Sequence, residues 1–171
     1  MAALTALSAG ISVLIISISA HFVTRWSLYS QLDRELTETA AYMAGSIGTD
    51  LENMSGLNAG ALKAANTTLM VERADGQVIR IPGETVQLVP SHAEMAVART
   101  GFGSSARTGE TTDGVRYRMV AVPLNISGAN YALILAKPLA PTEATLNVLT
   151  GVLLWVGATG LGISILIGWS A

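Results

Sequence analysis

The sequence predicts an α+β domain held between two membrane-spanning helices. Every Lys, Arg, Asp and Glu lies between Arg25 and Glu143, both ends of the chain are apolar, and strand-like segments separated by turns fill the middle. Only 13% of the 171 residues are charged, whereas about a quarter is usual for a soluble domain. We therefore expect spans at 1–24 and 144–171, with a folded domain at 25–143.

The first expected span begins at the N-terminus. No residue before Arg25 is formally charged, and at about 1.5 Å per residue a helix of this length crosses a hydrocarbon core of about 30 Å. A cleaved signal peptide is the alternative, because Ser17, Ser19 and Ala20 are small enough for a cleavage site. The basic start of a signal peptide is missing, which favours the spanning helix.

The second expected span is uncharged and contains Trp155. Small residues four apart give each span a candidate surface for close helix contact. These candidate contact residues are Ala6, Gly10, Ala158 and Gly162. Neither terminus carries flanking Lys or Arg, so we expect the chain to be a segment of a longer polypeptide. The positive-inside rule counts Lys and Arg in short loops, so it does not predict the orientation of spans joined by a connection this long.

Beyond the first span, apolar residues recur at spacings of three and four, which is the pattern of an amphipathic helix. We expect the span to continue outward as a helix whose apolar stripe packs against the domain, a second copy of the chain, or both. This signal-helix packing stripe consists of Leu28, Leu32, Leu36, Ala40, Met43 and Ile47. The next segment, 45–66, indicates a helix end and a loop, with room for a short helix.

Alternating hydrophobicity and turn signals predict about five antiparallel strands. The run TLMVERADGQVIRIPG predicts a hairpin that turns at Ala74–Gly76, and SSARTGETTDGVRYRMVAVPL predicts another that turns at Asp113–Gly114. The run ANYALILAKPL adds a strand after Ser127–Gly128. Between the hairpins, SHAEMAVART predicts a short helix in which Ser91 is the N-cap and Glu94 completes a capping box.

No catalytic or metal-binding pattern occurs in the sequence. The chain has no cysteine, and neither His21 nor His92 lies in a metal or nucleophile motif. The acidic residues are scattered singly, so we expect them to be solvated surface groups. A net charge of −2 without a basic cluster argues against nucleic acid as a partner. We predict a non-enzymatic chain that needs no cofactor and no metal.

Three segments resemble the sensory half of actinobacterial two-component sensor histidine kinases of the MprB type. They are SLYSQLDRELTETA after the first span, the middle strands, and AKPLAPTEATLNVLTGVLLWVGATGLGISILIG leading into the second span. The resemblance covers nearly the whole chain and is weakest over 45–66. It implies a homodimer in the cell membrane, with 25–143 forming a PAS-like (PDC-type) extracytoplasmic sensor domain.

The resemblance also implies a function. The chain would receive an extracytoplasmic signal of the envelope-stress type and pass it to a cytoplasmic kinase core that lies outside these residues. Its partners would then be membrane lipid, a second copy, that kinase core, and an extracytoplasmic ligand or protein. Two alternatives stay open, a two-span accessory subunit of a larger membrane complex and an enzyme with its site in the outer domain. A phospho-acceptor helix encoded beyond Ala171 would identify the kinase.

Overall fold

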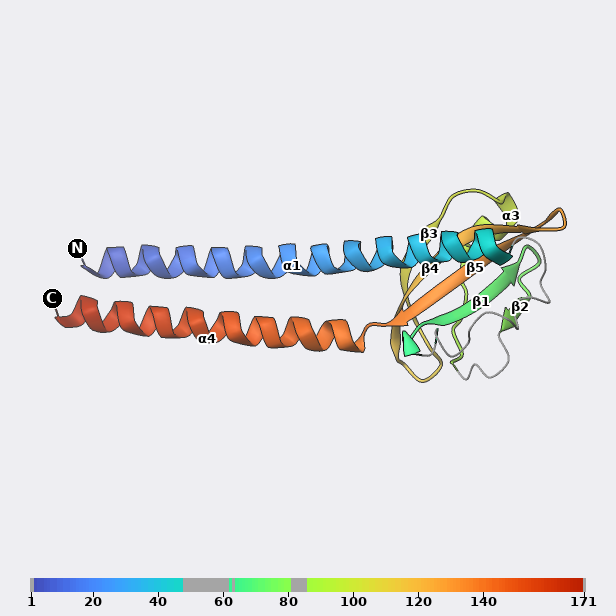
Figure 1. Ribbon diagram of the computed structural model, residues 1–171. Helices are drawn as coiled ribbons and strands as arrows, with labels where there is room; N and C mark the ends of the chain where they lie inside the picture. The colour runs from blue at the N-terminus through green and yellow to red at the C-terminus, as the bar shows by residue number, and fades with distance from the viewer. Residues whose placement is uncertain (1, 48–61, 63, 81–85, 171) are drawn as a thin grey trace. The chain divides into compact units, whose positions relative to one another are not determined.

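The computed structural model describes residues 2–47, 62, 64–80 and 86–170 (Figure 1). Near the two chain ends, the side chains of residues 2–7, 9, 161, 164–165 and 167–170 are also outside this description. The hydrophilic segment that the sequence assigns to a helix end and a loop therefore lies mostly outside the described residues.

Five antiparallel strands form one sheet in the order β2-β1-β5-β4-β3. The strands are β1 Thr68–Arg73, β2 Val78–Arg80, β3 Ser105–Glu110, β4 Arg116–Ile126 and β5 Ala129–Pro138. Three described helices accompany them, namely α1 Ala2–Ile47, α3 His92–Thr100 and α4 Ala140–Ser170. The predicted α+β class, with a long N-terminal helix and five antiparallel strands, is confirmed.

The turns form where glycine allows the backbone to reverse. Gly76 has φ 86°, a left-handed value that costs glycine little, and the Arg73 amide donates to the Gln77 carbonyl at 2.8 Å across this turn. At the β4–β5 turn both Ser127 and Gly128 have positive φ, 52° and 83°, as a tight type I′ hairpin requires. Both turns lie where the sequence predicts them.

Helix α3 begins with the predicted capping box. The Ser91 hydroxyl accepts from the Ala93 amide at 3.2 Å, and the Glu94 carboxylate accepts from the Ser91 amide at 2.6 Å. The helix ends at Thr100 and is capped by Gly101, whose φ of 68° is left-handed. Local capping chemistry therefore fixes both ends of this helix.

Successive residues of a strand point to opposite faces of the sheet. Both sets of residues are buried here, so both faces of the sheet are covered. One face, which we call the α1 face, contains Arg118 and Lys137 together with the buried residues Leu69, Val71, Val120, Val122, Leu133 and Leu135. The α3 face forms a core with Met70, Leu88, Val97, Ala98, Met119, Ala121, Ala132, Ile134 and Ala136. The middle of β4 and β5 is consequently apolar at nearly every position.

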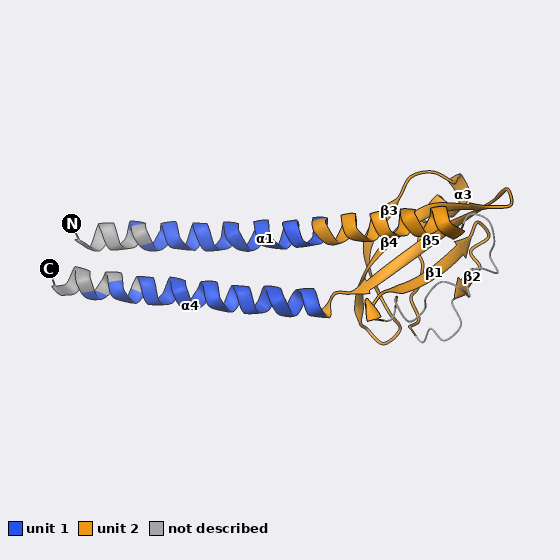
Figure 2. Cartoon of the chain, viewed as in Figure 1, with its two compact units in different colours: residues 1–30, 141–171 blue, residues 31–140 orange. Residues whose placement is uncertain are grey.

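The chain divides into two compact units (Figure 2). One contains residues 1–30 and 141–171, and the other contains residues 31–140. Helix α1 contributes to both units, since the division falls inside it. The second unit begins with the last part of α1 and ends just after β5.

Candidate functional site

The last part of α1 is tied to the sheet by two ion pairs. Asp33 accepts from Arg118 Nε at 2.5 Å and from Nη2 at 2.6 Å, and Lys137 Nζ donates to Glu35 at 3.1 Å. Arg118 and Lys137 are register partners on β4 and β5, so neighbouring strands contact residues within one turn of the same helix. We call these contacts the helix–sheet ion pairs.

The two helix–sheet ion pairs differ in strength. The Arg118 and Asp33 side chains are only 17% and 27% exposed, and the guanidinium bonds both carboxylate oxygens. A charge-assisted pair of this kind contributes about 1.5–3 kcal/mol. Glu35 is 60% exposed, so its pair with Lys137 contributes at most about 1 kcal/mol. Asp33 and Arg118 therefore form the main polar link between α1 and the sheet.

The predicted packing stripe lies along the same helix. Leu32, Leu36, Ala40 and Ile47 are buried, with Leu36 at 3% and Ala40 at 0% exposure. Leu28 and Met43 are half-buried. The stripe's role in signalling stays a prediction, but its buried members Leu32 and Leu36 flank the helix residues of the helix–sheet ion pairs.

On the α3 face, Glu94 is fully buried and accepts four hydrogen bonds. They come from the Ser91 amide and hydroxyl at 2.6 and 2.7 Å, from Arg107 Nε at 2.7 Å, and from the Ser105 hydroxyl at 3.2 Å. Burial acts to raise the pKa of Glu94, but the bonds from Arg107 and Ser91 outweigh it and hold the pKa below its ordinary value. Glu94 is therefore a buried carboxylate with a matched cation.

Arg107 reaches Glu94 across a strand position that has no side chain. A Cβ atom on Gly109 would lie 2.9 Å from Arg107 Nη1 and 2.6 Å from the sulfur of Met119. The Arg107 Nη2 atom also donates to the Val89 carbonyl at 2.9 Å. The guanidinium therefore links β3 to the segment before α3, through space that Gly109 leaves open.

Glu72 is the second buried acid on this face, and it is less well paired. Glu72 is only 2% exposed, and its Oε2 atom accepts no hydrogen bond from the described residues. Burial and the nearby Glu94 carboxylate raise the pKa of Glu72, while Arg107 and Arg99 offset part of this rise. The expectation that the acidic residues are solvated is wrong for Glu72 and Glu94.

The raised pKa of Glu72 predicts a pH-dependent stability. The folded state binds this proton more tightly than the unfolded state, so the stabilising contribution is complete below the unfolded pKa and is lost as pH rises through the folded pKa. Glu72→Gln removes the ionisation while keeping the shape. We expect the variant to gain stability over wild type as the pH rises above the ordinary pKa of a glutamate, measured by urea unfolding in detergent micelles. A pH-independent difference would contradict this assignment.

The candidate helix contact residues lie in the other unit. Gly10 is buried, whereas Ala158 and Gly162 are exposed, and the side chain of Ala6 lies outside the described residues. A Cβ atom on Gly157 would lie 3.6 Å from a methyl group of Val13, while one on Gly162 would have no neighbour within 4 Å. The contact role of the four small residues stays a prediction.

Within the described residues, one helix is long and apolar enough to cross a membrane, the part of α1 from Gly10 to Ile47. Exposed apolar side chains also line α4, among them Trp155 at 75% exposure. The second span stays a prediction, since part of 144–171 lies outside the described side chains. The described residues contain no group of three or more acidic or histidine side chains able to hold a metal ion.

Comparison with known proteins gives a relative for nearly the whole chain. No family model matches it. MprB of Mycobacterium tuberculosis and MprB of Mycobacterium bovis, each a signal transduction histidine-protein kinase/phosphatase, are 30% identical to it over 156 residues. This alignment includes 91% of the chain. Over these residues the chain is similar to MprB. The resemblance drawn from the sequence is thereby confirmed.

The chain spans 29% of the length of these MprB relatives. The relation to MprB connects it with two-component sensor kinases, while the kinase and phosphatase activities in the MprB name belong to the longer proteins. A solved structure of a Mycobacterium tuberculosis transcriptional regulator matches 46% of the chain and 30% of its own length. Its TM-score of 0.34 and identity of 19% are too low to add to the MprB relation.

Sequence reasoning missed the contacts that join distant parts of the chain. Asp33 and Arg118 are 85 positions apart, and Glu35 and Lys137 are 102 apart. The only available signal was the placement of acidic residues on α1 beside an apolar stripe, with basic residues on later strands. That signal indicates a charged flank on α1 but does not identify the strand that the flank contacts.

Proposed function

We propose that the chain is the sensing and transmembrane-signalling module of a two-component histidine kinase. Residues 1–24 and 144–171 would span the cell membrane, and residues 25–143 would form a PAS-like (PDC-type) domain outside the cytoplasm. The module would work as a homodimer, receive an envelope-stress type of signal from a ligand or protein, and pass it to a cytoplasmic kinase core. Catalysis would then belong to that core, with membrane lipid as the other partner.

One observation carries this proposal: strands β4 and β5 are linked to both long helices. Arg118 and Lys137 hold the last part of α1 through the helix–sheet ion pairs. Strand β5 ends at Pro138 and α4 begins at Ala140, so a displacement of β5 is passed directly into α4. A change in the β4–β5 pair would therefore move α1 and α4 relative to each other.

The energies involved suit such a mechanism. Coupling between a sensing site and an output is typically about 1–3 kcal/mol, and the Asp33–Arg118 pair contributes a similar amount. A signal that weakens or repositions this pair would consequently be sufficient to shift a two-state equilibrium. A packed helix–sheet contact responds to such a bias by changing between discrete arrangements.

The proposal is tested in a chimera in which residues 1–171 replace the matching segment of Mycobacterium tuberculosis MprB. Inserting two residues between Pro141 and Leu146 rotates the downstream helix by about 200°. We expect this insertion to change basal autophosphorylation and to abolish its response to detergent stress. A seven-residue insertion is the matched control, because it restores the helix phase to within about 20° and should preserve the response.

Two results would contradict the proposal. One is an unmodified chimera whose autophosphorylation ignores envelope stress, which would favour the accessory-subunit alternative. The other is equal signalling by the two-residue and seven-residue insertions, since phase would then not matter. Orientation is read in the same cells from Asp113→Cys, because the chain has no cysteine of its own and a membrane-impermeant maleimide should label the variant from outside.

A further inference from the structure

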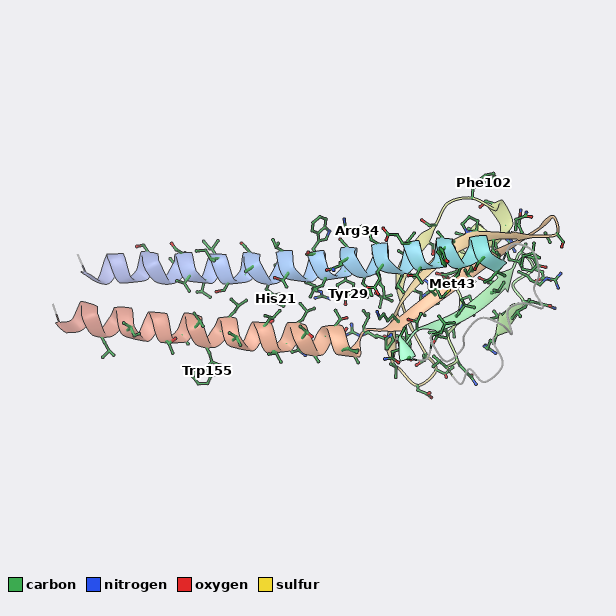
Figure 3. The ribbon with its side chains drawn as sticks, in the orientation of Figure 1. His21, Tyr29, Arg34, Met43, Phe102 and Trp155 are labelled. Carbon is green, nitrogen blue, oxygen red and sulfur yellow. The ribbon has the colours of Figure 1, made fainter. Side chains whose placement is uncertain are left out.

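Among the described residues, a polar side-chain contact joins helices α1 and α4 within their apolar unit. The Thr150 hydroxyl oxygen lies 2.9 Å from His21 Nδ1, and both side chains are partly buried there. Figure 3 shows His21 on the side of α1 that faces α4. The large side chains around it on α1 include Ile18, Phe22 and Val23, which are apolar and exposed.

The direction of this hydrogen bond follows from the protons available. Thr150 has one hydroxyl proton, which it donates to the Leu146 carbonyl oxygen at 2.8 Å. Its oxygen then acts as acceptor toward the ring, so Nδ1 of His21 bears the proton and donates it to Thr150. The result is a directed chain from the imidazole through the hydroxyl to the α4 backbone.

A second contact shows that the two helices approach along the same line. About two helical turns farther from the sheet domain along each helix, a Cβ on Gly157 would lie 3.6 Å from Val13. Gly10, a further turn along, is buried as well. Apolar packing of this kind tolerates sliding and rotation, whereas a hydrogen bond between helices specifies one register.

We propose that His21 and Thr150 form an interhelical clamp that sets the register of α1 against α4. The inference deepens the proposed function, on which its signalling role rests. An imidazole in an apolar helix is costly unless it has a partner, and Thr150 supplies the acceptor. His21 is thus a positioning residue that holds the two helices in the resting register.

The effect of the clamp on helix register can be measured in the isolated chain, without a kinase core. Val13→Cys and Gly157→Cys introduce a thiol pair into the cysteine-free chain, and its disulfide is equilibrated with glutathione in lipid nanodiscs. We expect Thr150→Val and His21→Ala each to lower the effective concentration of the thiols by about threefold, the usual effect of a hydrogen bond between membrane helices. Thr150→Ser, which retains the hydroxyl, should restore the wild-type value.

Thr159→Val is the matched control, because Thr159 is an exposed hydroxyl on the same helix that bonds only its own backbone. Equal cross-linking by the Thr150→Val and Thr159→Val variants, or no cross-linking in the parent pair, would overturn the clamp. In the MprB chimera, Thr150→Val should alter basal autophosphorylation and Thr150→Ser should not. Looser cross-linking with unchanged phosphorylation would overturn the signalling role, and an unmodified chimera that ignores stress would instead defeat the proposed function.

Discussion

Replacing Arg107 with alanine is expected to lower the free energy of unfolding by about 3 kcal/mol. The change removes the cation from a Glu94 carboxylate that has no solvent exposure. It also removes the hydrogen bond to the Val89 carbonyl. The estimate is at the low end of the range of about 3–5 kcal/mol for breaking a buried pair, because the Arg107 side chain is itself 27% exposed.

The measurement is urea unfolding of the 171-residue chain in detergent micelles, followed by pulse proteolysis. Adding Glu94→Gln to the Arg107→Ala variant should recover part of the loss, because a neutral amide costs less to bury than an unpaired carboxylate. Without Arg107 the pKa of Glu94 loses its main lowering influence, so the single variant should regain stability as pH falls. A loss below about 1 kcal/mol near pH 7, the range of a surface pair, would refute the buried ion pair.

Replacing Leu36 with alanine should destabilise the docking of α1 by about 2–5 kcal/mol, the usual cost of truncating a buried leucine. Leu36 is only 3% exposed, and it lies one turn beyond Asp33 on the helix. The loss should appear as faster amide hydrogen exchange along residues 31–47. Because the Asp33–Arg118 pair depends on this docking, the chimera should also lose its response to stress.

The matched control is Glu38→Ala, since Glu38 is an exposed residue on the same helix. A substitution there should change stability by no more than about 0.5 kcal/mol. If Leu36→Ala exchanged no faster than Glu38→Ala, the apolar stripe would not hold α1 against the sheet. The helix–sheet ion pairs, chiefly Asp33–Arg118, would then hold it alone.

Local signals predicted the elements of the fold because each depends on neighbouring residues. The glycine at 76 allows the first turn, Ser91 and Glu94 cap α3 within a few residues of each other, and the period of three and four along α1 marks its buried side. Such features form from the chemistry of a few consecutive side chains. They remain readable without knowledge of the partner segments.

Tertiary features were harder to predict because they depend on segments far apart. Strand β1 pairs with β5, and no local pattern says so. Glu72 stands in a strand where an acid is normally a solvent-facing residue, yet it lies on the face that α3 packs against and is buried. His21 contacts Thr150, which is 129 positions away in the sequence, so no local pattern could identify this partner.

Gly109 constrains how positions 107 and 109 can change during evolution. A side chain there would force the Arg107 guanidinium and the Met119 sulfur to shift, so retention of the Arg107–Glu94 pair favours retention of the glycine. A mutation filling position 109 first would push the guanidinium away from Glu94 and expose the domain to selection against an isolated buried anion. Side chains at position 109 should therefore occur more often where position 107 is no longer arginine.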